Sequence, residues 1–189
     1  MAIPVPIDLE TTGLDATVHA ILEFSMLLVT PDLELIGDFG SRVLRVTDEQ
    51  LDDMNDYVTD MHSRTGLLDE VRASTLSVDD VDDEAADWLT AQGLIEPRGD
   101  IILGSSCRMD LEFIERQMPK LASKLTYRMI DVSGMTEALQ MWEPTLVPEL
   151  PYELAARENW VPHRAASDIR WSLEGARGIK KNLGALIPR

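Results

Sequence analysis

The chain has a single cysteine and little positive charge, and each scarcity excludes a class of protein. One thiol, Cys107, cannot form a disulfide within the chain or build a cysteine-rich zinc site. No apolar stretch approaches the roughly 18 residues that a membrane-spanning helix needs, and no basic, apolar secretory signal is recognisable at the N-terminus. We therefore expect a cytoplasmic protein that does not enter a membrane.

The shortage of cations limits the partners that the chain can bind. Seventeen Lys and Arg residues stand against thirty-four Asp and Glu residues, which gives a net charge of −17. Such a chain is poorly suited to hold long nucleic-acid duplexes, because that grip needs many cation–phosphate contacts. Residues 48–87 hold fourteen acids and two bases, whereas residues 161–189 hold six bases and two acids. We expect an anionic substrate to meet the C-terminal part, with 48–87 as a solvated acidic face.

No repeat, low-complexity run or Gly/Ser-rich linker divides the sequence, so we interpret residues 1–189 as one domain. Short apolar runs predict strands, and apolar residues at helical spacing predict helices. We predict strands at 3–9, 21–29, within 33–46, at 100–104 and at 127–132, and helices within 48–92 and at 109–118, 133–142 and 165–183. Strands first, then strands alternating with helices, predict an α/β fold with a mixed five-stranded sheet flanked by helices.

Four carboxylates and one imidazole form the pattern that carries chemistry. Asp8 and Glu10 lie two residues apart at the end of an apolar run, so a strand would place both on one face. Their repulsion would raise a pKa or recruit a cation. Asp110 lies near the start of a predicted helix. His163 precedes the last helix, and Asp168 lies about one turn into it. An imidazole is well suited to take a proton near neutral pH.

The order D-x-E, a distant Asp and then H-x-x-x-x-D resembles the DEDDh exonucleases, and the longer motifs resemble the oligoribonucleases among them. The similarity runs over nearly the whole chain, and several long motifs in one order are far more specific than any one of them. The matching segments are IDLETTGLD at 7–15, HSRTGL at 62–67, VRAST at 71–75, GSSCRMD at 104–110, FIERQMPKL at 113–121, YRMIDVS at 127–133 and HRAASDIRWSL at 163–173.

The resemblance implies a ribonuclease H-like exonuclease fold and a metal-dependent 3′→5′ exoribonuclease that cuts short oligoribonucleotides to 5′-mononucleotides. At the matching positions Asp8, Glu10, Asp110 and Asp168 would be metal ligands, and His163 the general base. Carboxylate oxygens suit Mg²⁺ or Mn²⁺. Two such ions per site would activate a water and stabilise the leaving 3′-oxygen.

The resemblance also implies a reason for a preference for very short substrates. Leu14 matches a leucine that wedges between bases, and Tyr57 matches an aromatic residue that stacks on one. Ser106, Arg128 and Ser133 match a cap for the substrate's 5′-phosphate, a role that suits the planar donors of arginine. A capped site two nucleotides long needs few basic residues, which agrees with the strongly negative chain.

Two further matches concern assembly and sugar contacts. Tyr127 matches a tyrosine that reaches into the neighbouring subunit's site, so the resemblance implies a homodimer. His62 lies in a matching segment, where it would either contact substrate phosphate or sugar or make a structural hydrogen bond.

The chain departs from the family pattern at several positions. Tyr57 stands where tryptophan is usual, which weakens stacking. Ser105 stands where asparagine is usual and Arg108–Met109 where Gly-Gln is usual, which puts the positioning of Asp110 in question. Ser167 replaces an acid just before Asp168.

Two other functions stay open. One is a DEDDh exonuclease acting on single-stranded DNA 3′ ends, as in proofreading domains, although the sequence has no stripe of Lys and Arg to track a longer strand. The other is a non-catalytic acidic interaction protein, such as a mimic of nucleic-acid charge, that would bind through residues 48–87. Such a protein has no need of the complete acid set beside His163.

Overall fold

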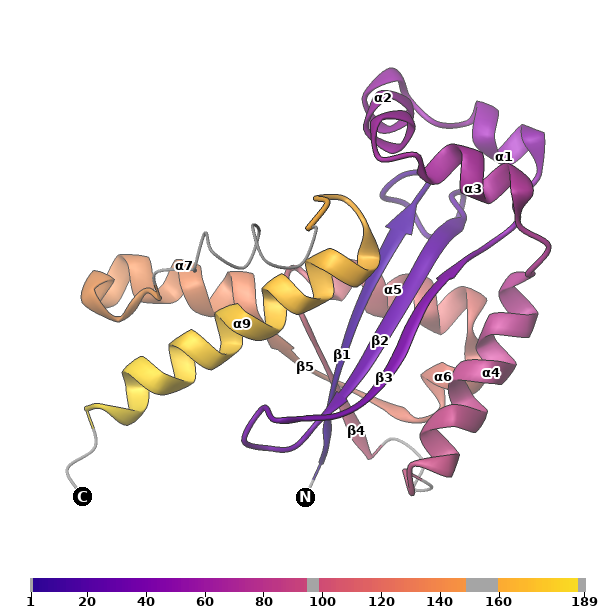
Figure 1. Ribbon diagram of the computed structural model, residues 1–189. Coiled ribbons are helices and arrows are strands. Elements are labelled where there is room, and N and C mark those ends of the chain that lie inside the picture. Colours follow the sequence, from indigo (N-terminus) through magenta and orange to yellow (C-terminus); the bar gives the residue numbers. More distant parts are fainter. Residues whose placement is uncertain (1, 95–98, 149–159, 187–189) are drawn as a thin grey trace.

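The computed structural model describes residues 2–94, 99–148 and 160–186. A five-stranded sheet with the strand order β3–β2–β1–β4–β5 lies at its centre (Figure 1). The first three strands form an antiparallel meander, and β4 and β5 continue the sheet in parallel. The strands are Pro4–Thr11 (β1), Ile21–Val29 (β2), Leu35–Val43 (β3), Asp100–Gly104 (β4) and Leu125–Asp131 (β5). The predicted mixed α/β sheet is therefore confirmed.

Helices cover both faces of this sheet. The short 3₁₀ segment Pro144–Leu146 (η1) follows α7. The α-helices are Asp48–Asp52 (α1), Asp56–Arg64 (α2), Leu67–Ala73 (α3), Val78–Ala91 (α4), Arg108–Gln117 (α5), Pro119–Ala122 (α6), Val132–Trp142 (α7) and Ala165–Gly184 (α9). No helix in the described ranges is both long and apolar enough to cross a membrane.

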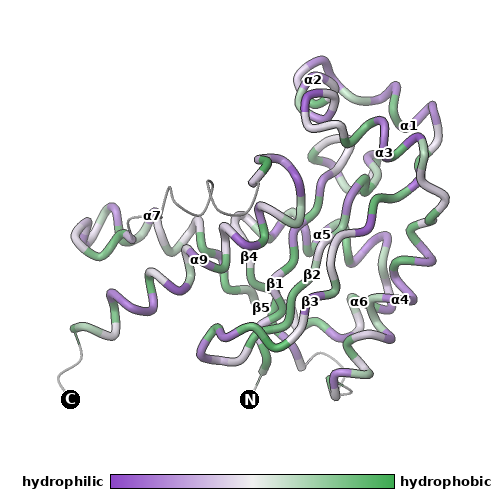
Figure 2. The backbone as a smooth tube through the Cα atoms, viewed as in Figure 1, coloured by the Kyte–Doolittle hydropathy of each residue, from purple (hydrophilic) through white to green (hydrophobic). Residues whose placement is uncertain are grey.

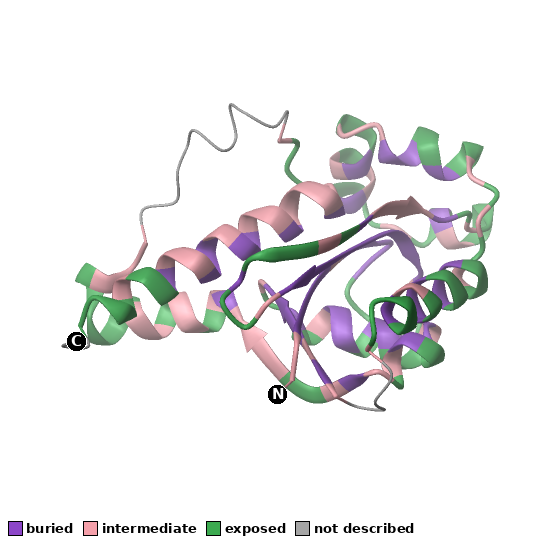
Figure 3. Cartoon of the chain, turned by 60° about the horizontal axis from the view of Figure 1, so that its bottom comes forward, coloured by how far each residue is buried: buried purple, intermediate pink, exposed green. Residues whose placement is uncertain are grey.

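Alternation along β2 divides the core into layers. Phe24 and Met26 face a cluster that α4, α5 and α6 cover, whereas Leu27 and Val29 face a cluster covered by α7 and α9. Successive side chains of a strand point to opposite faces, so a strand buried on both sides reads as a continuous apolar run. The central strands are accordingly largely hydrophobic in Figure 2 and buried in Figure 3.

Local signals explain where the helices begin and end. Ser77 and Asp80 form a capping box at the start of α4. Pro119 ends α5 and begins α6. The predicted helical region 48–92 is divided into four helices because Asn55 caps a new start and Gly66 adopts a left-handed conformation with φ 77°.

The fold brings distant segments together at one end of the sheet. Strand β1 runs toward α2 and α3, and the first turn of α9 lies beside the same end of β1 (Figure 1). Helix α9 packs across β1 and β2, and α5 packs on β1. The carboxyl end of β1 therefore meets the first turns of α5 and α9, which contain the predicted ligands Asp110 and Asp168.

Candidate active site

Three of the four predicted metal ligands converge at this end of β1. Asp8 and Glu10 project from β1, and Asp168 comes from the first turn of α9. Each of the three offers a carboxylate oxygen, and these oxygens all lie within 4.8 Å of one another. Leu9, between the two strand acids, points into the core and is 5% exposed. The strand alternation predicted from D-x-E is therefore what places both acids on one side.

The fourth predicted ligand, Asp110, lies beside this cluster. It is buried in the first turn of α5, where its Oδ1 accepts a hydrogen bond of 3.0 Å from the backbone N–H of Leu9. Its charge is also among the causes that raise the pKa of Asp8. One oxygen of Asp110 is thus committed to the backbone of β1, and the carboxylate stays next to Asp8.

The crowded acids hold their protons more tightly than exposed acids do. Burial, followed by the charges of Asp110 and Asp168, raises the pKa of Asp8 well above its ordinary value. Burial and then Asp168 raise the pKa of Glu10 to about 8. Burial also raises the pKa of Asp110, to about 7, and that of Asp168. Hard oxygen donors that repel one another fit divalent cations, which relieve the repulsion.

His163 lies on the turn that leads into α9. Its backbone N–H donates to Oδ2 of Asp168 at 3.0 Å, which fixes the turn to the acidic cluster. The side chain is exposed and lines a pocket of about 370 Å³ between α2 and the turn before α9. The other lining residues are Tyr57, Asp60, Met61, Arg64, Thr65, Val161 and Pro162. The predicted base and the predicted stacking residue therefore face the same space.

His62 is fully buried between α2 and the end of β1. Its Nε2 lies 3.0 Å from the carbonyl oxygen of Thr11, so Nε2 carries the proton and donates. Its Nδ1 has no hydrogen-bond partner and lies 3.9 Å from Oε2 of Glu10. Burial lowers the pKa of His62. The structural hydrogen bond that we considered for this residue is present, and the bare nitrogen faces the acidic cluster.

The predicted wedge and 5′-phosphate cap come from different loops. Leu14 is 81% exposed, at the tip of the loop between β1 and β2. Where β4 and β5 end, Oδ1 of Asp131 accepts from the N–H groups of Ser106, at 3.2 Å, and Gly134, at 2.9 Å. These bonds bring the turn after β4 to the start of α7, which holds Ser133. The structure thus places two of the three cap residues side by side.

Arg128, the third cap residue, lies with Tyr127 on β5, the outermost strand. Both side chains are exposed, and the guanidinium carbon of Arg128 lies 5.7 Å from the centre of the Tyr127 ring. Residues on a sheet edge are accessible to a second chain, so Tyr127 can be reached by a partner subunit.

Two departures from the family pattern have visible structural roles. Oγ of Ser105 hydrogen-bonds with Oγ of Ser172 at 2.8 Å, which ties the end of β4 to α9. Oγ of Ser167 accepts from the N–H of Val161 at 3.2 Å and closes the turn that carries His163.

The sequence reasoning missed Glu23 and Arg164. Glu23 is 1% exposed, pairs in register with Glu10 across β1 and β2, and forms an ion pair with Arg164. An acid within the apolar strand ILEFSMLLV was the signal, because a buried carboxylate needs a partner.

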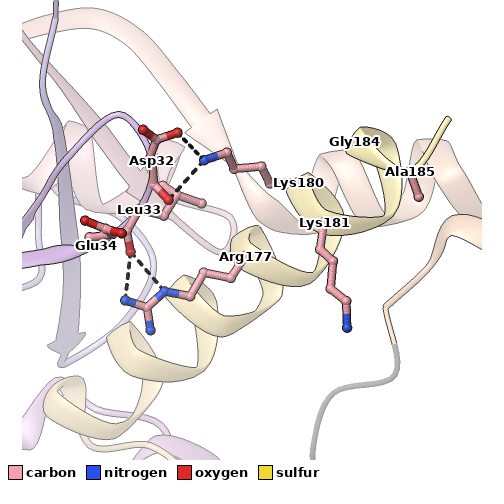
Figure 4. A pocket seen from close by; sticks show the side chains of 8 residues that line it. All are labelled: Asp32, Leu33, Glu34, Arg177, Lys180, Lys181, Gly184 and Ala185. Atoms are coloured by element: carbon pink, nitrogen blue, oxygen red, sulfur yellow. Dashed lines mark hydrogen bonds and ion pairs between the residues drawn. The ribbon is translucent and has the colours of Figure 1, made fainter. Parts of the chain in front are cut away.

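The basic residues of the C-terminal part are mostly engaged within the chain. Arg170 pairs with Asp38 and Lys180 with Asp32. Figure 4 shows a pocket of about 870 Å³ at the far end of α9, where Arg177 donates to the carbonyl oxygen of Leu33. The expectation that substrate meets the C-terminal part therefore rests on His163 and Asp168 rather than on these paired cations.

Comparisons with known proteins point to one family. The family model described as Exonuclease, RNase T, matches residues 5–174. An oligoribonuclease of Corynebacterium diphtheriae is 39% identical over 163 residues, which cover 86% of this chain and 74% of that protein. An oligoribonuclease of Mycobacterium tuberculosis is 35% identical over 183 residues, which cover 97% of this chain and 81% of that protein.

Among solved structures, the zinc-bound form of an E. coli exonuclease I complex with single-stranded DNA has a similar fold. The TM-score is 0.70 at 16% identity, over 97% of this chain and 41% of that chain. At this identity the similarity shows the fold alone. The chain spans less than half the length of that exonuclease.

Proposed function

The chain belongs to the oligoribonuclease family of exonucleases, and from this premise we propose that it is a 3′→5′ exoribonuclease acting on oligoribonucleotides of two to a few nucleotides. The observation that carries the proposal is the cluster of Asp8, Glu10 and Asp168. The backbone N–H of His163 donates a hydrogen bond to Asp168. The names of the bacterial relatives support the choice of short RNA as substrate.

The four acids would hold two Mg²⁺ or Mn²⁺ ions, since four carboxylate charges balance two divalent cations. When bound, these ions supply Lewis acidity for an in-line displacement at the terminal phosphodiester. Asp8, Glu10 and Asp168 would each offer an oxygen to these ions, and Asp110 would add one from the start of α5. The number of ions and their identity are part of the proposal.

His163 acts as the general base. Its imidazole lines the pocket that also holds Tyr57 and accepts a proton from the attacking water, and the product is a 5′-mononucleotide. Asp168 holds the backbone of His163 in place through the bond of 3.0 Å.

The ends of the substrate are read by exposed side chains on both sides of the acids. Leu14 separates bases and Tyr57 stacks on one, which favours a 3′-terminal nucleotide in the His163 pocket. Ser106, Arg128 and Ser133 bind the 5′-phosphate of a short strand. The buried Nδ1 of His62 would act on the substrate only indirectly, through Glu10, whose Oε2 lies 3.9 Å away.

We include a homodimer in the proposal. The edge strand β5 exposes Tyr127, and the last turn of helix α7 exposes Met141 and Trp142, so exposed apolar side chains are available to a second subunit. Tyr127 of one subunit would then complete the site of the other. A location in the cytoplasm and a single domain over residues 1–189 also stay predictions.

The test is a turnover series on RNA of two to ten nucleotides and a 20-mer, with DNA of matched sequence, at fixed Mg²⁺. We expect the rate per 3′ end to be highest for the dinucleotide and to fall as the strand lengthens. If the 20-mer is degraded faster per 3′ end than the dinucleotide, and DNA faster than RNA, the result would favour the exonuclease that acts on single-stranded DNA ends. No hydrolysis of any strand would favour the acidic interaction protein.

A further inference from the structure

His163 has an unusual backbone conformation. Its φ of 60° lies in the left-handed region, which residues other than glycine rarely adopt. Such a conformation is strained and persists only where the surroundings hold it. Asp168 holds the His163 N–H, and Ser167 holds the N–H of Val161 at the beginning of the turn. A third restraint comes from the residue that follows His163.

Arg164 joins this turn to two other elements. Its guanidinium donates to both carboxylate oxygens of Glu23, at 3.0 and 3.1 Å, and to both of Glu70, at 2.9 and 2.7 Å. Glu23 also accepts from the N–H of Ala165 at 3.1 Å and from the hydroxyl of Ser41 at 2.5 Å. We call Arg164, Glu23 and Glu70 the Arg164 clamp.

The Arg164 clamp ties the turn that carries His163 to two other elements. Glu23 lies in β2 and is 1% exposed, whereas Glu70 lies in α3, the helix that follows the Tyr57 helix. The side chain of Arg164 is 19% exposed, so its bonds to the buried Glu23 are sheltered from water. Ion pairs with two forked acceptors fix direction as well as distance. The turn before α9 is therefore tied both to the sheet and to α3, the helix after the one that lines the pocket.

We propose that Arg164 is a positioning residue for the reaction: with Glu23 and Glu70 it holds His163 in its left-handed conformation and so aims the imidazole at the acidic cluster. This inference rests on the proposed function, because it assigns Arg164 no role except through His163. Its guanidinium is bound to Glu23 and Glu70, neither of which is a proposed metal ligand.

The experiment is a double-mutant cycle on dinucleotide hydrolysis with Arg164→Gln, His163→Ala and the double variant. Arg164→Gln should lower kcat by on the order of tenfold to a hundredfold with little change in KM, as expected for a misplaced catalytic group. In the His163→Ala background the same substitution should lower kcat no further, because its effect passes through the missing imidazole. Losses that multiply in the double variant would overturn the proposal.

The conservative variant separates positioning from charge. Arg164→Lys keeps the positive charge near Glu10 but lacks the planar fork, so kcat should recover only in part. Full recovery with lysine would mean that charge alone matters. If Arg164→Gln needs a different Mn²⁺ concentration for half-maximal rate, the substitution acts on the cation site. Full recovery with lysine or a changed Mn²⁺ requirement would each overturn the positioning role of Arg164.

Arg177 offers a matched control on the same helix. It donates through Nε and Nη2 to the carbonyl oxygen of Leu33, which also has a left-handed φ, of 67°, but lies at the remote pocket of Figure 4. Arg177→Gln should change thermal stability while leaving kcat unchanged. An equal loss of kcat in both variants would show a general loss of structure and would refute a specific role for Arg164.

A milder variant applies if Arg164→Gln does not fold. Glu70 is about half exposed, and Glu70→Gln removes only the outer arm of the clamp. It should lower kcat by about threefold to tenfold, again with no further loss in the His163→Ala background. If the wild type is active and Glu70→Gln has the same kcat, the positioning role of the Arg164 clamp is refuted and the proposed function is not. An inactive wild type would instead refute the proposed function.

Discussion

Oδ1 of Asp110 accepts a hydrogen bond of 3.0 Å from the backbone N–H of Leu9, which lies 101 positions earlier in the chain. This bond fastens the first turn of α5 to the strand that carries Asp8 and Glu10. One carboxylate therefore has two duties, because it holds the backbone of the site and adds charge to it. The two duties can be separated by substitution.

Asp110→Asn keeps an oxygen that can accept from Leu9, whereas Asp110→Ala leaves that buried N–H without a partner. We expect both variants to lose hydrolysis. Only the alanine variant should also lose stability, by about 1–3 kcal/mol. Thermal denaturation without metal and dinucleotide turnover measure the two effects. An asparagine variant with wild-type turnover would show that Asp110 serves the structure alone.

Metal-free protein should lose stability as the pH rises from about 6.5 to 8. The unfolded chain releases the protons of Glu10 and Asp110 near their ordinary values of 4.5 and 3.8, but the folded chain holds them until about pH 8 and 7. The unfolded state thus binds fewer protons over this range, so the free energy of unfolding falls. His62, whose pKa burial lowers, opposes the fall only below its ordinary value near 6.5.

Melting temperatures in EDTA across this pH range give the test. Glu10→Gln should flatten the profile, and Mg²⁺ should raise the melting temperature more at pH 8 than at pH 5, because the ions compete with protons. Asp32→Asn is the control, because Lys180 lowers the pKa of Asp32 and that carboxylate lies away from the acidic cluster. It should leave the slope between pH 6.5 and 8 unchanged. A wild-type profile that is level or rises toward pH 8 would contradict the crowding of the acids.

Tyr57 should control the KM of the dinucleotide and little else. Loss of base stacking in Tyr57→Ala should raise KM about 5- to 100-fold, with kcat nearly unchanged. Because the residue is 72% exposed, the melting temperature should not move. Tyr57→Trp, with its larger ring, should lower KM. Leu35→Ala removes a similarly exposed apolar side chain from β3 and serves as control. Equal KM values across the Tyr57 series would remove this residue from the substrate site.

Arg128 should set the preference for a 5′-phosphate. We expect wild-type protein to cleave a 5′-phosphorylated dinucleotide faster than its unphosphorylated form. Arg128→Ala should reduce this ratio about 10- to 100-fold, as for loss of a hydrogen bond to a charged group. Arg128→Lys should keep part of the ratio, because it retains the charge without the fork. Competition between the two substrates in one reaction measures the ratio directly, and an unaltered ratio in Arg128→Ala would disprove the cap.

Local patterns predicted most of the scaffold. Strand β2 and strand β4 have the predicted bounds, and the D-x-E spacing correctly placed Asp8 and Glu10 on one side of β1. These features depend on alternation and on apolar runs, which short stretches of sequence contain. The convergence of Asp110 and Asp168 on that strand came from the family resemblance, since no local pattern specifies a contact across a hundred residues.

The Arg164 clamp lay beyond sequence reasoning for the same reason. Arg164 directly follows His163, the predicted general base. Nothing in the segment HRAASD indicates that the arginine forms an ion pair with Glu23, 141 positions earlier. The left-handed backbone of His163 was equally hidden, because histidine carries only a weak preference for that region. Both follow from the packing of α9 across the sheet.

The most direct test of the metal-dependent site is the rate at which a 5′-phosphorylated RNA dinucleotide releases 5′-mononucleotide as Mn²⁺ is added to EDTA-treated protein. Wild-type protein should be inactive without metal and gain activity as the ion is added. Asp8→Asn should remain folded and be slower by on the order of a thousandfold at saturating Mn²⁺. Hydrolysis that persists in EDTA, or an Asp8→Asn variant as fast as wild type, would contradict the account.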